Sequence, residues 1–247
     1  DSSPETEETS LPYPKGWAED RLTGFQNSAF RNIVGTFATK KESVGLLQEI
    51  NEAFYSIGEN LINPKDTYAA MLLPRCHSAY LAGTRLAMSG QATDTFPSLR
   101  ACLEFALYAL HINSNSDLGN VWMARHDDDK TYKASRTQFA HVKVMETLSK
   151  REKALHPIIH KLYTRTIDFG GHPNERSGTS SMKLVRTENG FELPMIYLHG
   201  DSTALDHVLK TSAQVGLGSL RIFRLVFPER FAILGINERL DSLKDSG

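Results

Sequence analysis

The sequence has few of the residues on which disulfide-rich, membrane-spanning or strongly basic proteins depend. Its only two cysteines, Cys76 and Cys102, fall within apolar helical patterns. Two such cysteines exclude a disulfide scaffold and suggest buried thiols in a reducing compartment. The best apolar run, from Phe105 to Ile112, is far shorter than the ~18 residues of a membrane span. We therefore expect a cytoplasmic protein with no membrane partner.

The sequence has no surplus of positive or negative charge. The chain has 28 Lys and Arg against 29 Asp and Glu, and its formal net charge is −1. This balance excludes a basic nucleic-acid-binding arm. A glycine-rich phosphate loop is also lacking, because Gly216 and Gly218 have neither a third glycine nor a preceding strand. We expect no nucleotide cofactor of the usual kind, and no other cofactor is predicted.

The first residues differ in composition from the rest of the chain. Asp1 to Lys15 contains four acidic residues, three prolines and almost no large apolar side chain. Such a segment cannot bury enough surface to offset the entropy lost on ordering. We predict a disordered acidic tail over residues 1–20 and a single helical-bundle domain over residues 21–247.

Apolar residues recur at spacings of three and four along most of the chain, which is typical of amphipathic helices. Pro74 lies inside one such pattern, so either that helix kinks or a new helix begins at Leu73. Gly170 and Gly171 are expected to provide a positive-φ helix cap. A linker that contains Trp122 and Arg125 is expected after the polar stretch from Asn113 to Asp117. The predicted helices are Ser43–Leu61, Asp66–Met88, Asp94–Asn113, Lys130–Leu148, a helix from Lys153 or His156 to Phe169, and Thr203–Phe227.

Asn189-Gly190 is the strongest hairpin signal in the sequence, and extended segments at 182–185 and 192–198 flank it. Pro194 confines the second segment to the edge of a sheet. Gly216 and Gly218 lie within the last predicted helix and would let another helix approach closely. The predicted fold is therefore an all-α helical bundle with one small β-hairpin near residues 182–198.

Four polar residues form one stripe on the helix that follows Pro97. Arg100, Glu104, Tyr108 and His111 are spaced four, four and three apart, so they share one helical face. The stripe is either an ion pair at the edge of the core or a polar wall that faces a cleft between helices. A related hypothesis is a small-ligand pocket lined by Tyr108, Trp122 and Tyr163, with Arg100 as the anchor for an anion.

Arg165 and His172 form a second candidate site. Arg165 falls on an apolar helical stripe, where a charged group needs a partner; Asp168 and Glu104 are the candidates. His172 follows the glycine pair, where the negative end of the helix would raise its pKa. An arginine that holds a phosphate and a histidine that moves a proton can cleave a phosphodiester, although the same pair is also common as structure.

Two histidine patterns in the sequence have spacings that occur in metal sites. His156 and His160 are four residues apart, but the glutamate of a metalloprotease motif does not follow His156. His126-Asp127 resembles the doublet of helical phosphohydrolases, yet Asp128 and Asp129 follow it, and helix capping explains such a run more simply. No metal site is predicted.

The chain resembles a group of uncharacterised bacterial all-helical proteins. The resemblance rests on Leu99-Arg100-x-x-x-Glu104, on Trp122 to His126, and on Gly171-His172-Pro173-Asn174 after a helix end. These proteins are distantly similar to the HEPN superfamily, which contains metal-independent ribonucleases and non-catalytic binding or scaffolding members. In that superfamily an arginine precedes the catalytic histidine by four to six intervening residues. The resemblance implies a ribonuclease site at Arg165 and His172.

Three functions remain open. The first is a non-catalytic helical binding or oligomerisation module, the second a metal-independent ribonuclease of HEPN type, and the third a pocket for a small anion or nucleotide. A homodimer and RNA or a nucleotide are considered as partners. The candidate catalytic residues are Arg165 and His172, and the candidate binding residues are Arg100, Glu104, Tyr108, Trp122, Arg125, Asp168 and Asn174.

Overall fold

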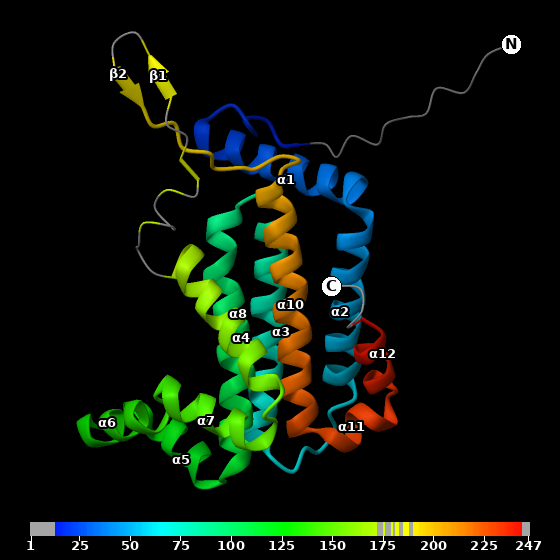
Figure 1. Cartoon of the computed structure of the whole chain (residues 1–247), viewed down its shortest axis with the longest axis vertical. Helices are drawn as coiled ribbons and strands as arrows, with labels where there is room; N and C mark the ends of the chain where they lie inside the picture. Colours follow the sequence, from blue (N-terminus) through cyan, green and yellow to red (C-terminus); the bar gives the residue numbers. More distant parts are fainter. Residues whose placement is uncertain are drawn as a thin grey trace, which may run out of the picture.

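The computed structural model describes residues 13–171, 175, 179, 181–182, 185–187 and 190–243. This part of the chain is mainly helical and contains one two-stranded antiparallel hairpin (Figure 1). The predicted all-α bundle with one small β-hairpin is confirmed. Residues 13–20 form turns, and Asp20 caps the first helix by accepting from the backbone N–H groups of Leu22 and Thr23.

Long helices that run along one another form the bundle. These are α2 (Lys41–Glu59), α3 (Thr67–Met88), α4 (Ala92–Ser114), α8 (Leu155–Thr166) and α10 (Thr203–Val226). α10 is buried on most of its circumference and contacts each of the other four. Because a helix buried all round belongs to a core, α10 is the central element of the bundle (Figure 1).

Small residues let α10 lie close to its neighbours. A Cβ atom added at Gly216 would lie 2.6 Å from the Tyr80 ring of α3 and 2.7 Å from Cγ2 of Ile50 of α2. A Cβ added at Gly218 would lie 2.8 Å from Cδ1 of Ile159 of α8. The predicted close approach of other helices at these glycines is confirmed.

Gly216→Ala and Gly35→Ala are expected to change stability in opposite directions. Gly35 lies within a helix, and a Cβ there meets no atom within 4 Å, so alanine should stabilise the fold by about 0.5 to 1 kcal/mol. At Gly216 the same change overfills the core, and a net loss of about 1 to 2 kcal/mol is expected. Chemical denaturation of both variants measures the two signs. Equal effects would show that α10 does not need a small residue there.

One end of the bundle is covered by α1 (Arg21–Thr39), which lies outside the predicted helices. Its side chains reach the end of α3: Thr36 Oγ1 donates to the Met88 carbonyl at 2.9 Å, and Asn32 Nδ2 donates to the Ser89 carbonyl at 3.1 Å. α3 itself is one helix that contains Pro74, and Gly90, with a φ of +83°, follows its C-cap.

The helix predicted from Asp94 begins earlier than expected, at Ala92. Thr95 lies inside this helix, and its N–H and hydroxyl both donate to the Gln91 carbonyl. Pro97 is accordingly inside the helix rather than at its start.

The prediction of a linker after the polar stretch from Asn113 to Asp117 is wrong. Most of it is helical, as α5 (Asp117–Met123) and η1 (Ala124–His126). The reason is tertiary, because α5 buries Leu118 and places Gly119 against the Tyr68 ring, where a Cβ would lie only 2.1 Å from Cδ2. Only glycine permits this contact.

The prediction of a single helix from Lys130 to Leu148 is also wrong. The structure has two helices, α6 (Asp129–Gln138) and α7 (His141–Arg151). Asp128 caps α6 by accepting from the N–H of Thr131. At the break, the ring of the buried His111 contacts both helices, with Nε2 3.0 Å from the Gln138 carbonyl and Nδ1 2.7 Å from Thr147 Oγ1. This contact from α4 stabilises a break that the local sequence does not signal.

The helix α8 continues into a π-helical turn, η2 (Ile167–Gly171). Gly170 does not have the positive φ expected of a cap. It allows a close approach instead, since a Cβ there would lie 2.3 Å from the Thr93 carbonyl oxygen of α4. The predicted role of Gly170 as a left-handed cap is therefore wrong.

The hairpin consists of β1 (Val185–Thr187) and β2 (Gly190–Glu192), with Thr187 paired to Gly190. Gly190 is thus the first residue of β2. After α10 the chain forms α11 (Pro228–Ile233) and α12 (Ile236–Ser242). Cys76 and Cys102 are buried free thiols whose Sγ atoms lie 3.4 Å apart. Within the described residues, no helix combines the length and the apolar character required to cross a bilayer.

Candidate functional site

The polar stripe of α4 forms a hydrogen-bonded group with α8. Glu104 Oε1 accepts from Arg100 Nε at 2.9 Å and from the Tyr163 hydroxyl at 2.9 Å. The Arg100 guanidinium lies over the Tyr163 ring, with its Cζ atom 5.3 Å from the ring centroid. The side chains of Arg100 and Glu104 are 28% and 39% exposed, so the ion pair is open to solvent on one side.

These residues line a cavity of about 210 Å³ between α4, α7 and α8. Of the candidate binding residues, the structure brings Arg100, Glu104 and Tyr108 together there. Tyr163, which the pocket hypothesis included, also lines the cavity. The remaining lining residues are Leu107, Phe139, His141 and Val144. Three of the four residues of the stripe on α4 thus lie on one wall of the cavity, and His111 does not.

Phe139 and His141 belong to the site and were missed by sequence reasoning. The His141 ring stacks on the Tyr163 ring, with centroids 4.0 Å apart and planes at 17°. The Phe139 ring lies 5.0 Å from the Tyr108 ring, and the Tyr108 hydroxyl donates to the Phe139 carbonyl at 3.4 Å. Neither glycine nor proline marks the break between α6 and α7, so the sequence could not place these two residues at a helix junction.

Charges of both signs surround the cavity. The carboxylate of Glu104 is paired with Arg100, and the positive charge of Arg125 acts on Tyr108 from η1. α7 begins at His141, and Ala140 at its N-cap provides no side-chain acceptor. The partial positive charge of a helix start therefore lies at the rim of the cavity.

Both tyrosines of the cavity stay protonated at neutral pH. Burial, with the neighbouring charge of Glu104, raises the pKa of Tyr163 to about 12. Burial and Glu104 also raise the pKa of Tyr108. Both hydroxyls therefore keep the protons that they donate to Glu104 and to the Phe139 carbonyl.

His111, the last member of the stripe, does not line the cavity; it joins α4 to α6 and α7. It is 7% exposed, and both ring nitrogens are engaged by the α6 and α7 contacts described above. Because a carbonyl can only accept, Nε2 of His111 donates to Gln138.

Stability is expected to fall on mild acidification. Burial lowers the pKa values of His77, His111 and His141 below the ordinary value of 6.5. Near and below pH 6.5 these histidines bind protons more readily in the unfolded chain than in the folded chain. The free energy of unfolding therefore decreases as the pH falls from about 7.5 to about 5.5. Urea denaturation at several pH values measures this slope, and His111→Gln should reduce it. A stability that rises on acidification would contradict these pKa directions.

The other candidate residues lie elsewhere. Arg165 Nη1 donates to Gln214 Oε1 at 2.8 Å and to Thr211 Oγ1 at 3.3 Å, so it is bound to α10 and not to Glu104. Asp168 lies in η2 and Trp122 in α5, where it packs against the core; neither lines the cavity. The Arg125 guanidinium lies 5.3 Å from the Tyr132 ring centroid. His172 and Asn174 lie outside the described residues.

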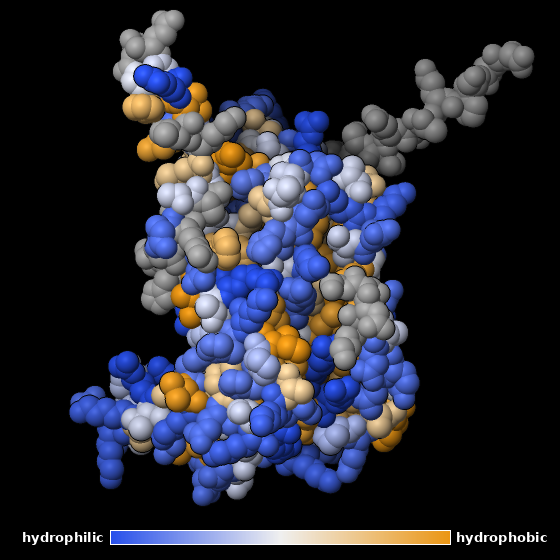
Figure 2. All heavy atoms as spheres, viewed as in Figure 1, coloured by the Kyte–Doolittle hydropathy of each residue, from blue (hydrophilic) through white to orange (hydrophobic). Residues whose placement is uncertain are grey.

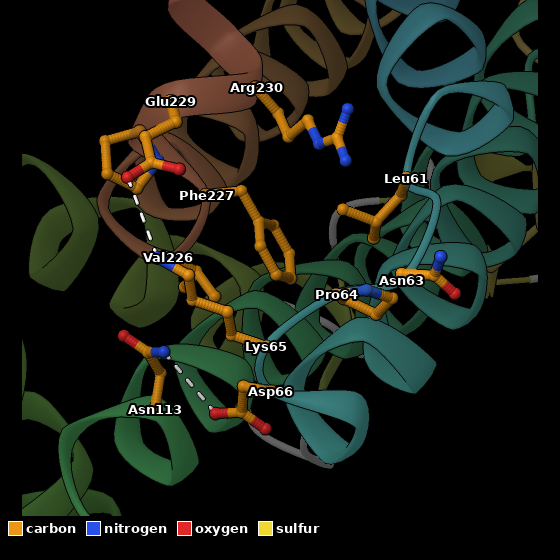
Figure 3. Close-up of a pocket in the computed structure, with 11 residues that line it drawn as sticks. Leu61, Asn63, Pro64, Lys65, Asp66, Asn113, Val226, Phe227, Glu229 and Arg230 are labelled. Carbon is orange, nitrogen blue, oxygen red and sulfur yellow. Dashed lines mark hydrogen bonds and ion pairs between the residues drawn. The ribbon is translucent and has the colours of Figure 1, made fainter.

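A second cavity, of about 250 Å³, lies between the α2–α3 connection and the start of α11 (Figure 3). The Phe227 ring projects into it. Asp66 caps α3 and accepts from Asn113, and Arg230 donates to the Ile62 carbonyl. Phe227 is the one aromatic residue of this lining, whereas four aromatic rings line the cavity beside Arg100.

Comparisons with protein-family models, with curated proteins and with solved structures gave no match. Among the residues that the structure describes, no group of three or more His, Cys, Asp or Glu side chains is placed to hold a metal ion.

Proposed function

We propose that the protein is a non-catalytic helical module that binds a small organic anion in the cavity between α4, α7 and α8. The observation that carries this proposal is the placement of Arg100, two tyrosine hydroxyls and an aromatic wall around about 210 Å³. Concave sites with a few convergent polar groups are the usual form of small-ligand sites.

The chemistry of the lining indicates what fits. Arg100 is fixed on one side by Glu104 and Tyr163, so its guanidinium is oriented before a ligand arrives. A carboxylate or phosphate group is the natural partner of an oriented guanidinium. The rings of Tyr108, Phe139 and His141 suit a planar group beside that anion. The favoured ligand is an aromatic ring that bears a carboxylate or a phosphate.

Thermal unfolding with a panel of anions tests this proposal. The probes are inorganic phosphate, benzoate and phenyl phosphate, and the account expects phenyl phosphate to stabilise the protein most. A ligand at 100 times its dissociation constant stabilises by about 2.7 kcal/mol, which corresponds to roughly 5 to 10 °C. No stabilisation by any of the three anions would contradict the proposal.

The matched variants are Arg100→Ala and Arg75→Ala. Arg75 also lies over an aromatic ring, with its Cζ atom 5.4 Å from the Phe105 centroid, but it does not line the cavity. We expect Arg100→Ala to abolish the stabilisation by phenyl phosphate and Arg75→Ala to retain it. An equal response in the two variants would place binding outside the cavity.

A second candidate function is the metal-independent ribonuclease of HEPN type that uses Arg165 and His172. The observation that favours it is local charge: from Lys130 to Arg165 the chain has nine Lys and Arg and only two Glu. Lys and Arg that neutralise phosphates supply most of the sequence-independent affinity for RNA. In this proposal Arg165 stabilises the phosphate and His172 transfers the proton.

Cleavage of end-labelled RNA in the presence of a chelator tests the second candidate. The ribonuclease account expects cleavage by the wild type and none by His172→Ala, with both proteins folded by circular dichroism. The absence of cleavage by the wild type on single-stranded and structured RNA would exclude this activity for the isolated protein.

A further inference from the structure

An apolar surface covers the end of the molecule at which α1 and the hairpin meet. On α1, the exposed face carries Leu22, Phe30, Val34 and Phe37, which are 67%, 45%, 53% and 56% exposed. On and beside the hairpin, the exposed large hydrophobic residues are Met182, Phe191, Leu193, Met195, Ile196 and Tyr197. We call these ten residues the end surface. Figure 2 shows hydrophobic side chains on the hairpin and at its base.

The two halves of the end surface are anchored to the same part of the bundle. The Tyr197 ring meets the Phe25 ring of α1 edge-on, with centroids 6.4 Å apart. The base of the hairpin is held by a Thr93–Ser181 hydroxyl contact of 2.8 Å and by the His199 N–H, which donates to the Gly90 carbonyl at 2.8 Å. β1 and β2 themselves project beyond the bundle beside α1 (Figure 1).

The size of the end surface is that of a stable protein interface. With about 200 Å² for each side chain, which is the middle of the range for aromatic residues, the exposed fractions correspond to an area on the order of 1,000 Å². A standard interface buries about 800 Å² on each partner, whereas the largest apolar patch on a typical monomer is about 300 to 600 Å². A surface of this size predicts a partner.

Few charges flank the end surface, and they are of both signs. α1 carries Arg21 and Arg31, and Asp20 caps its start. The hairpin carries Glu192 on β2 and Arg186 on β1, whose Cζ atom lies 6.0 Å from the Phe191 ring centroid, and Asp201 is paired with Lys40 at 2.6 Å. In a two-fold dimer each half of a surface meets the other half of the partner's surface. Glu192 of one protomer would then face Arg31 of its partner.

We propose that the end surface is a homodimer interface in which the hairpin of one protomer packs on α1 of the other. The exposed side chains of the end surface amount to the area that each partner of a standard interface buries, and a two-fold dimer covers this area on both protomers at once. The described hairpin has only two strands, so each strand also has one edge open to the partner.

Sedimentation equilibrium of the full chain tests the dimer. The account expects twice the 27.6 kDa chain mass for the wild type at micromolar concentration. Phe30→Asp and, separately, Phe191→Asp should raise the dimer dissociation constant at least a hundredfold. Val142→Asp and Ile233→Asp are the controls, because these residues are 77% and 75% exposed but lie outside the end surface. A monomeric wild type, or equal weakening by the control variants, would overturn the proposal.

Charge reversal tests the pairing of Arg31 with Glu192. Arg31→Glu and Glu192→Arg should each weaken the dimer about tenfold or more, and the double variant should restore it. Restoration fails if the two residues do not face each other across the dimer. Co-sedimentation of a monomeric wild type with phosphatidylserine vesicles, lost in Phe30→Asp, would assign the surface to a membrane and overturn the dimer.

Discussion

Replacing Ile222 with alanine is expected to lower the free energy of unfolding by about 2 to 5 kcal/mol and the melting temperature by roughly 5 to 15 °C. Ile222 is fully buried on α10, the helix that contacts four other helices of the bundle. The loss has two physical parts, the transfer of buried methyl and methylene groups and the cavity that remains after truncation. Calorimetry of the variant measures the effect.

Ile233→Ala is the matched control for this variant. Ile233 lies on α11 and is 75% exposed, so its truncation should change stability by no more than about 0.5 kcal/mol. If the two variants lost similar stability, α10 would not be the centre of the bundle.

Glu104→Ala is expected to lower the free energy of unfolding by about 1 to 2 kcal/mol and the pKa of Tyr163 from about 12. The carboxylate accepts from both Arg100 and Tyr163, and its removal leaves two donors beside a partly closed cavity. The stability effect stays modest because the Glu104 side chain is 39% exposed. Urea denaturation gives the first quantity, and a pH titration of labelled tyrosine by NMR gives the second.

Glu146→Ala is the control for Glu104→Ala. Glu146 also pairs with a cation four residues later, Lys150 at 2.7 Å, but both side chains are exposed. Such surface pairs contribute about 0.3 to 0.5 kcal/mol, and no tyrosine depends on this one. A Tyr163 pKa that stays near 12 in Glu104→Ala would show that burial alone raises it.

The long helices were predictable because each buries a regular apolar stripe. Ser43–Leu61 and Thr203–Phe227 agree with α2 and α10 to within about two residues. The break between α6 and α7 was not predictable, because it depends on the ring of His111, which approaches from α4. The helical character of α5 similarly depends on Gly119 meeting Tyr68, a contact between residues far apart in sequence.

Only the part of the candidate site that lies on α4 could be predicted from the sequence. The spacing of Arg100, Glu104 and Tyr108 placed them on one helical face, and periodicity within a helix is local information. His141 enters the site because α7 starts there, and Arg165 leaves it because Gln214 and Thr211 on α10 bind its guanidinium. The positions of His141 and Arg165 both depend on how helices pack against one another. The spacing of residues along a single helix contains no information about this packing.

Imidazole NMR during a titration with phenyl phosphate tests the central claim most directly. His141 stacks on Tyr163 at the cavity, while His77 stacks on Phe54 on another face of the bundle and serves as the internal reference. The account predicts saturable shifts of the His141 signals, unchanged His77 signals, and no His141 shift in Arg100→Ala. Unchanged His141 signals in the wild type would contradict an anion-binding cavity between α4, α7 and α8.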